Sequence, residues 1–177
     1  MSPLTPTPFT IGDVSVRADL RPGDLGRLIA LHGRAYEGET THFGVVFEAY
    51  VAETVAEYVI GNAARGRIWF AERGRELVAT TAMAERRDGA RRRGQLRWIV
   101  ADRSVRGMGI GRRLIDEAMA YARVEGFDEV FLETTEGLDA SMAIYERLGF
   151  QVVSRERQKL WLDENVVITM ALSLSDR

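Results

Sequence analysis

Two spacings of apolar residues divide the chain into predicted strands and helices. Apolar residues that alternate with polar ones, and short apolar runs, predict strands. Apolar residues three and four positions apart predict helices that bury one face. The predicted strands are residues 14–17, 67–71, 76–82, 95–100, 130–134, 151–153 and 166–172, and the predicted helices are residues 24–35, 44–60, 109–124 and 139–148.

Turn and cap residues fall between these segments. Asp24, after a proline and a glycine, offers an N-cap for the first helix. Gly126 is expected to end the third helix and Gly149 the fourth. Arg73-Gly74 and Asp88-Gly89 predict the turns between the middle strands. This order of elements predicts an α+β protein.

Length and composition fit one ordinary domain. The chain has 177 residues, of which 46% are hydrophobic and 28% charged, which is typical of a soluble globular protein. Residues 1–10 contain three prolines and are expected to form a loose lead. Residues 11–177 contain no repeat and no linker, so we expect them to form a single domain.

The charge is small in total but unevenly distributed. The formal net charge is -2, which argues against a dedicated nucleic-acid-binding protein. Residues 86–113, however, contain ten arginines and two acids, so they carry +8 and the remainder of the chain carries −10. A local positive field of this kind attracts anionic ligands.

The absent residue types exclude several chemistries. There is no cysteine, which excludes disulfides, thiol nucleophiles and thiolate metal sites. His32 and His42 lie ten positions apart without a third ligand pattern, so we expect no metal site. The sequence has no signal-peptide pattern and no apolar run near the roughly 20 residues that span a bilayer. We therefore expect a cytoplasmic protein with no membrane contact.

The most informative segment is the glycine-rich loop between a predicted strand and a predicted helix. It reads Arg-Gly-Met-Gly-Ile-Gly-Arg over residues 106–112. Glycines let a ligand approach the backbone, and the N–H groups of the first helical turn attract phosphate. A Walker loop is excluded because the only lysine is Lys159, and a G-x-G-x-x-G dinucleotide motif is not matched. A turn with only a structural role is the alternative.

These residues resemble the GNAT superfamily of acetyl-CoA-dependent N-acetyltransferases. Arg106-x-x-Gly109-x-Gly111 is similar to the family's R/Q-x-x-G-x-G/A signature, and residues 95–111 resemble its fourth strand and pyrophosphate loop. Residues 137–150 resemble its following helix, with the Tyr-x-x-x-Gly-Phe ending. The resemblance covers residues 14–174 and is strongest to GNAT domains associated with MarR-type regulators. Because only a short lead precedes residue 14, we expect no regulator domain in this sequence.

The resemblance implies a fold and a cofactor site. The fold would have about four helices and a mixed, mostly antiparallel sheet of six or seven strands, splayed between strands 4 and 5. The cofactor would be acetyl-CoA as co-substrate, with no metal. Its pantetheine amides would pair with the backbone of one strand edge, and its pyrophosphate would bind the loop N–H groups. The residues implied are Ile99, Val100 and Ala101 for the strand edge, and Arg106, Gly107, Met108, Gly109, Ile110, Gly111 and Arg112 for the loop.

The chain departs from the family at two positions. The family often has proline where this chain has Arg103, which removes a rigid turn. Many members have asparagine where this chain has Leu138, so one polar contact to the cofactor is lost. Asp139 and Ser141 are the nearest polar replacements.

The resemblance and the residue chemistry together assign the catalytic groups. Tyr145 matches the family tyrosine near the thioester sulfur and is expected to act as general acid, since a phenol near pKa 10 can donate to a thiolate near pKa 8.5. Glu133 is the first candidate for the general base, because it lies on the same face of its strand as Phe131. Glu37 and Glu39 are the second candidates, and a water relay is the alternative.

Substrate binding is expected from two segments that combine aromatic and acidic residues, residues 36–43 and 161–164. Such segments suit a small molecule or peptide that has a cationic amine and an apolar body. The named residues are Tyr36, Glu37, Phe43 and Trp161. The run Arg91-Arg-Arg93 is expected at a hairpin tip, where it is solvated, lies near the cofactor's 3′-phosphate or contacts an acidic partner.

Acetyl transfer from acetyl-CoA to an amine is the function this sequence favours. A non-catalytic acyl-CoA-binding module on the same fold is the first alternative, and a nucleic-acid-binding module that uses the arginine segment is the second. The sequence does not identify the acceptor. It also leaves the oligomeric state open, a homodimer included.

Overall fold

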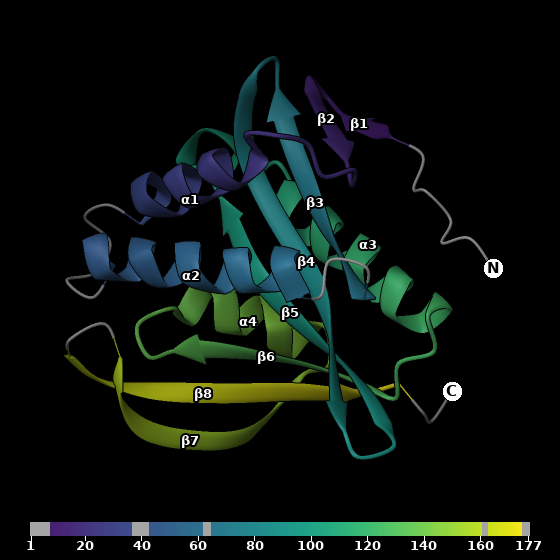
Figure 1. Cartoon of the computed structure of the whole chain (residues 1–177), viewed down its shortest axis with the longest axis vertical. Helices are drawn as coiled ribbons and strands as arrows, with labels where there is room; N and C mark the ends of the chain where they lie inside the picture. Colours follow the sequence, from purple (N-terminus) through teal and green to yellow (C-terminus); the bar gives the residue numbers. More distant parts are fainter. Residues whose placement is uncertain (1–7, 37–42, 62–64, 161–162, 175–177) are drawn as a thin grey trace.

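The computed structural model describes residues 8–36, 43–61, 65–160 and 163–174, which form an α+β fold (Figure 1). Eight strands form one sheet in the order β1-β2-β3-β4-β5-β6-β8-β7. They are β1 (Phe9–Ile11), β2 (Val14–Arg17), β3 (Gly66–Arg73), β4 (Glu76–Asp88), β5 (Arg91–Ala101), β6 (Glu129–Thr135), β7 (Gln151–Leu160) and β8 (Asp163–Ser173). The helices are α1 (Asp24–Ala35), α2 (Val45–Gly61), α3 (Ile110–Val124) and α4 (Asp139–Arg147), with a 3₁₀ turn at Arg103–Val105.

The helices cover both faces of the sheet. In Figure 1, α1 and α2 cross one face and α3 lies against the other. The apolar stripe of α1, which includes Leu28 and Leu31, packs with α2 on Phe70 and Trp98 of the sheet. The buried face of α3 packs in a second cluster on the opposite side. The four predicted helices are therefore present, because each has an apolar stripe that the sheet can bury.

The sheet opens between β5 and β6. These two strands pair in parallel over only three residues each, and Gln95↔Phe131 is the last pair. Five of the other six strand pairings continue for four to nine residue pairs, and all six are antiparallel. The expected splay between the fourth and fifth strands of the family fold is confirmed. It leaves the edge of β5 from Leu96 to Ala101 without a pairing to β6.

An irregularity in β5 accompanies this opening. The register of β4 and β5 shifts between Thr80 and Ala82, and Trp98 has a φ of 46°. A positive φ is strained for a bulky residue and must be held by its surroundings. The Thr80 hydroxyl donates to the Trp98 carbonyl oxygen at 2.7 Å, which holds the bulge in place.

The structure differs from the sequence prediction at the sheet edges. β1 adds an eighth strand where the loose lead was expected, and the expected domain start after residue 10 falls inside it. β7 extends to Leu160, although only residues 151–153 were predicted as strand. Residues 154–159 are polar, so their sequence carries no apolar alternation, and pairing with β8 supplies the order instead.

Among the described residues, no helix has the length and apolar character that crossing a membrane requires.

Candidate functional site

A groove of about 630 Å³ lies between the end of β5, the loop before α3, and α4. Gly107 and Gly109 in this loop have φ of 80° and 77°, and an added Cβ at either would meet no atom within 4 Å. The glycines are therefore needed for their backbone conformation, and the space beside them is open to a ligand.

Several backbone N–H groups of this loop have no hydrogen-bond partner among the described residues. The loop uses two of its N–H groups internally, from Arg106 to Arg103 and from Met108 to Val105. No described hydrogen bond uses the N–H groups of Gly107, Gly109, Ile110, Gly111 and Arg112. Unpaired N–H groups at a helix N-terminus, together with the helix dipole, bind phosphate well.

The side chains of the loop have structural contacts. Arg106 donates from Nε to the Ala101 carbonyl at 3.3 Å and from Nη2 to the Ala35 carbonyl at 3.2 Å, so it ties the loop to β5 and α1. Arg112 pairs with Asp116 at 3.0 Å. Met108 does not line the groove; its sulfur lies 3.4 Å from Arg73 Nη2.

The other eleven residues expected at the cofactor site line this groove. They are Ile99, Val100, Ala101, Arg106, Gly107, Gly109, Ile110, Gly111, Arg112, Asp139 and Ser141. Leu138, which the resemblance matched to an asparagine position, also lines it. Arg147 lines it from α4, a residue that the sequence motifs did not single out.

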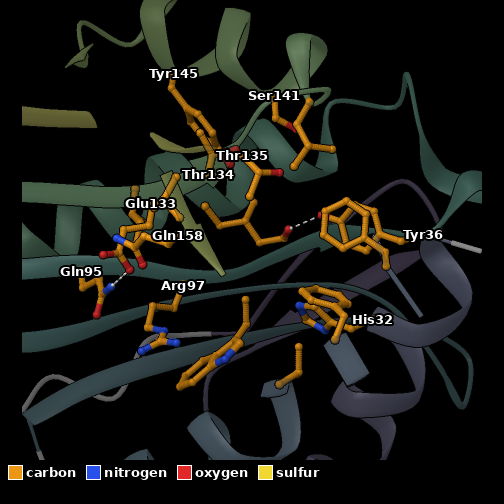
Figure 2. Close-up of a pocket in the computed structure, with 18 residues that line it drawn as sticks. His32, Tyr36, Gln95, Arg97, Glu133, Thr134, Thr135, Ser141, Tyr145 and Gln158 are labelled. Atoms are coloured by element: carbon orange, nitrogen blue, oxygen red, sulfur yellow. Dashed lines mark hydrogen bonds between the residues drawn. The ribbon is translucent and has the colours of Figure 1, made fainter. Parts of the chain in front are cut away.

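A second cavity of about 200 Å³ lies on the α1 and α2 side of the opening between β5 and β6 (Figure 2). One part of its wall is aromatic: Phe43 lies 4.6 Å from Tyr36 and 4.7 Å from Phe47, centroid to centroid. Another part is polar and comes from Gln95, Arg97 and Glu133. Figure 2 shows these polar side chains on the opposite side of the view from Tyr36.

Tyr145 lies on the wall that the groove and the cavity share. It is one of five residues that line both the groove and the cavity, the others being Tyr36, Ile99, Leu138 and Ser141. Its side chain points from α4 toward Thr134 and Thr135 in Figure 2. Burial raises the pKa of Tyr145 well above the usual value, and no described hydrogen bond involves its hydroxyl. The phenol is therefore protonated at neutral pH and is a weaker acid than the sequence suggests.

Glu133 belongs to a chain of polar contacts at the cavity's polar end. Gln95 donates from Nε2 to Glu133 at 3.1 Å and accepts from Arg86 Nε at 3.0 Å. These contacts orient the exposed carboxylate at the cavity wall. Glu133 was selected by alternation along its own strand, β6. The same pattern along β5 predicts that Gln95 and Arg97 share one face, but neither was predicted as a site residue.

His32 lines the cavity from α1 and was not expected there. Its Nδ1 lies 2.9 Å from the Leu28 carbonyl oxygen. Because a carbonyl only accepts, Nδ1 carries the proton and Nε2 is an acceptor. Burial lowers the pKa of His32 to about 4, against a smaller opposite effect of the Leu28 contact, so the ring is neutral at physiological pH.

Two of the four expected acceptor residues, Tyr36 and Phe43, line the cavity. Glu37 and Trp161, like the second base candidate Glu39, lie outside the described residues. Within the described part of the chain, no group of three or more histidine, aspartate and glutamate side chains could hold a metal ion.

A family model and several known proteins match this chain. The model of the "Acetyltransferase (GNAT) family" matches residues 32–150. The chain is 32% identical over 90 residues to N-acetyltransferase 8F1 of Rattus norvegicus, which is 50% of this chain and 41% of that protein. It is 35% identical over 68 residues to glucosamine 6-phosphate N-acetyltransferase of Trypanosoma brucei brucei, 38% of this chain and 44% of that protein. The matches thus span about two fifths of these relatives' lengths.

Solved structures share the fold. A putative GNAT acetyltransferase from Desulfovibrio desulfuricans has a TM-score of 0.71 at 21% identity, covering 90% of this chain and 98% of that one. The putative acetyltransferase yncA from Salmonella typhimurium, solved with its cofactor acetyl-CoA, has a TM-score of 0.68 at 17% identity, with 93% and 96% covered. An association with MarR-type regulators is not shown by these comparisons and stays a prediction.

Proposed function

The chain belongs to the GNAT acetyltransferase family, and from that premise we propose that it is an acetyl-CoA-dependent N-acetyltransferase. It transfers the acetyl group directly, within one complex, to a primary amine of a small molecule or peptide. The observation that carries this proposal is that the glycine-loop groove and the second cavity share the wall formed by Tyr145 and Ser141. Direct transfer is supported because the sequence has no cysteine that could carry an acyl group.

The residues of the groove fit acetyl-CoA, which supplies an activated acetyl thioester when bound. The five unpaired N–H groups from Gly107 to Arg112 hold its pyrophosphate. The backbone of Ile99, Val100 and Ala101 binds the pantetheine amides, since this edge of β5 has no pairing to β6. The acetyl-CoA found with the Salmonella relative supports this choice of cofactor.

The acceptor must reach the thioester as a neutral amine. For an amine of pKa ~10.4, removing the proton at pH 7 costs roughly 4–5 kcal/mol. Glu133 accepts that proton, either directly or through a water, from an amine bound in the cavity. The Trypanosoma relative, named for an amino sugar phosphate, also acetylates an amine, which supports an amine acceptor.

Tyr145 assists the departure of the thiol. The amine nitrogen forms a bond to the acetyl carbon, and the carbon–sulfur bond breaks with its electron pair on sulfur. The Tyr145 hydroxyl donates its proton to that sulfur and regains one from the acceptor nitrogen. The nitrogen loses two protons overall, one to solvent through Glu133 and one to the sulfur. Burial also raises the pKa of a thiol, so the sulfur can take a proton from a weakly acidic phenol.

Replacing Tyr145 with phenylalanine tests this function. Tyr145→Phe removes the proton donor and little volume, so we expect kcat to fall about 100-fold, within the range for a lost general acid. The dissociation constant for acetyl-CoA should stay within about threefold, because the pyrophosphate contacts are unchanged. Release of free CoA with a panel of amines gives kcat, and calorimetry gives the affinity.

Tyr121→Phe is the matched control. Tyr121 packs between Trp69 and Phe127 on the α3 side, away from both cavities, so this variant should keep its activity. Acetyl-CoA binding without CoA release from any amine would overturn the proposal and favour the non-catalytic acyl-CoA-binding module.

A further inference from the structure

The arginines near the β4–β5 turn differ in their partners. Four of them form ion pairs with the carboxylates of Glu85 and Glu129: Arg87, Arg91, Arg92 and Arg93. Arg86 and Arg97 instead contact neutral groups, the Gln95 side-chain oxygen and the Tyr50 hydroxyl. Among the described residues, no ion pair involves either of these two guanidinium groups.

Arg97 lines the polar end of the cavity, and Arg86 lies behind Gln95. The pKa of Arg86 is lowered first by partial burial and next by the positive charge of Arg97, so the two cations act on one another. The charges of Glu133 and Glu57 act on the pKa of Arg86 in the opposite direction. An anion bound at Arg97 would therefore be stabilised by both guanidinium groups.

Glu133 provides the opposite charge at the same end of the cavity. Figure 2 shows Glu133 and Arg97 on the same side of the view, and no described ion pair joins them. Because the carboxylate and the guanidinium do not neutralise one another directly, each is open to a ligand group. A ligand that carries an ammonium and a carboxylate on neighbouring atoms matches this arrangement.

The remainder of the cavity is suited to the apolar part of a ligand. Tyr36, Phe43 and Phe47 form one continuous aromatic contact, and Val51 and Trp98 extend the lining. The cavity volume of about 200 Å³ admits a small ligand.

We propose that the acceptor is a single amino acid with an apolar side chain, whose free carboxylate binds Arg97. Its α-amine faces Glu133 and the thioester beside Tyr145, and its side chain packs on the aromatic wall. This inference rests on the proposed acetyltransferase function and narrows its acceptor. Arg97 is a substrate-binding residue in this account, and Arg86 is a positioning residue that acts through Gln95.

Three acceptors that share a phenyl ring and a primary amine but differ at the carboxylate position test the inference: phenylalanine, its carboxamide and phenethylamine. The wild-type protein should use phenylalanine with a kcat/KM at least tenfold above that of the other two. Arg97→Gln should lower kcat/KM for phenylalanine about 10- to 100-fold, mainly through KM, because a charge-assisted contact is lost. The same variant should change kcat/KM for the carboxamide by less than threefold. Arg91→Gln, on the same strand and outside the cavity, should change neither.

The outcomes separate this inference from the proposed function. Equal use of all three acceptors, or an equal loss for all three in Arg97→Gln, would overturn the amino-acid acceptor while leaving acetyl transfer intact. Preference for phosphoethanolamine over phenylalanine would also overturn it. If no amine releases CoA, the proposed function fails, and calorimetry with N-acetylphenylalanine and its amide tests the site directly. Tighter, Arg97-dependent binding of the acid supports the inference, and equal binding contradicts it.

Discussion

His32 is a buried imidazole whose protonation is linked to folding. Its pKa in the folded chain is about 4, while the ordinary value is 6.5, so between these values the unfolded chain binds more protons. The free energy of unfolding therefore falls as the pH drops from 6.5 toward 4. Between pH 7 and pH 5 this one group should account for a loss of up to about 2 kcal/mol.

Urea unfolding at pH 7, 6 and 5 measures this linkage. His32→Asn keeps an N–H donor but cannot titrate, so its stability should vary less over this range than that of the wild-type protein. Burial raises the pKa of Glu72, but the hydrogen bonds and charges of Arg17 and Arg27 outweigh it and hold this pKa below its usual value. The stability that such a carboxylate contributes is therefore lost at lower pH. Identical slopes for the two proteins would contradict the linkage.

Some single-residue roles follow from the sequence and others need the packed structure. Alternation along a strand was sufficient to select Glu133, which lines the cavity. The spacing of the glycines was sufficient to select Gly109, which lines the groove. The raised pKa of Tyr145 could not be predicted, since it results from burial by elements far apart in the chain. The partners of Arg106 could not be predicted either, because the Ala35 carbonyl comes from a distant helix.

At the scale of elements, the packing of β5 against its neighbours depends on Gly94. This residue pairs with Val130 in the short parallel ladder that precedes the opening of the sheet. A Cβ here would lie 2.5 Å from Met83 Sδ and 2.7 Å from Phe127 Cδ2. Gly94→Ala should therefore lower the free energy of unfolding by about 1–3 kcal/mol, as overpacking usually does.

Urea titration of Gly94→Ala, with Gly26→Ala as control, measures this cost. Gly26 lies in α1 with no atom within 4 Å of an added Cβ, so alanine there should raise stability by up to about 1 kcal/mol. Wild-type stability in Gly94→Ala would contradict this cost and show that the Met83 and Phe127 side chains can move aside.

A helix or strand could be predicted from the sequence where its apolar side chains are buried in a core cluster. The helices and central strands carried clear apolar patterns because each buries a face in one of the two clusters. The second half of β7 lacked such a pattern, since its order comes from backbone pairing with β8. β1 packs Phe9 and Ile11 against a cluster, but its three residues are too short to stand out as a strand in the sequence. Sequence periodicity detects burial of side chains and does not detect edge pairing.

At the scale of the whole molecule, the charge is arranged differently from what the sequence suggested. Of the ten arginines in residues 86–113, Arg106 and Arg112 line the glycine-loop groove. Within the described residues, five of the other eight pair with acids, namely Arg87, Arg91, Arg92, Arg93 and Arg113, and Arg97 faces the second cavity. The groove gains a further cation from Arg147 on α4, outside that segment. The proposed cofactor site therefore relies on backbone donors more than on the local surplus of arginine.

Titration of acetyl-CoA into Gly109→Asp tests the central claim most directly. The aspartate would place a carboxylate where the loop N–H groups are expected to bind pyrophosphate, so we expect affinity to fall at least 100-fold. Gly74→Asp is the matched control, since Gly74 has a φ of 61° and open space around it but lies outside the groove. It should bind acetyl-CoA as the wild-type protein does. Unchanged affinity in Gly109→Asp would contradict the assignment of this groove to acetyl-CoA.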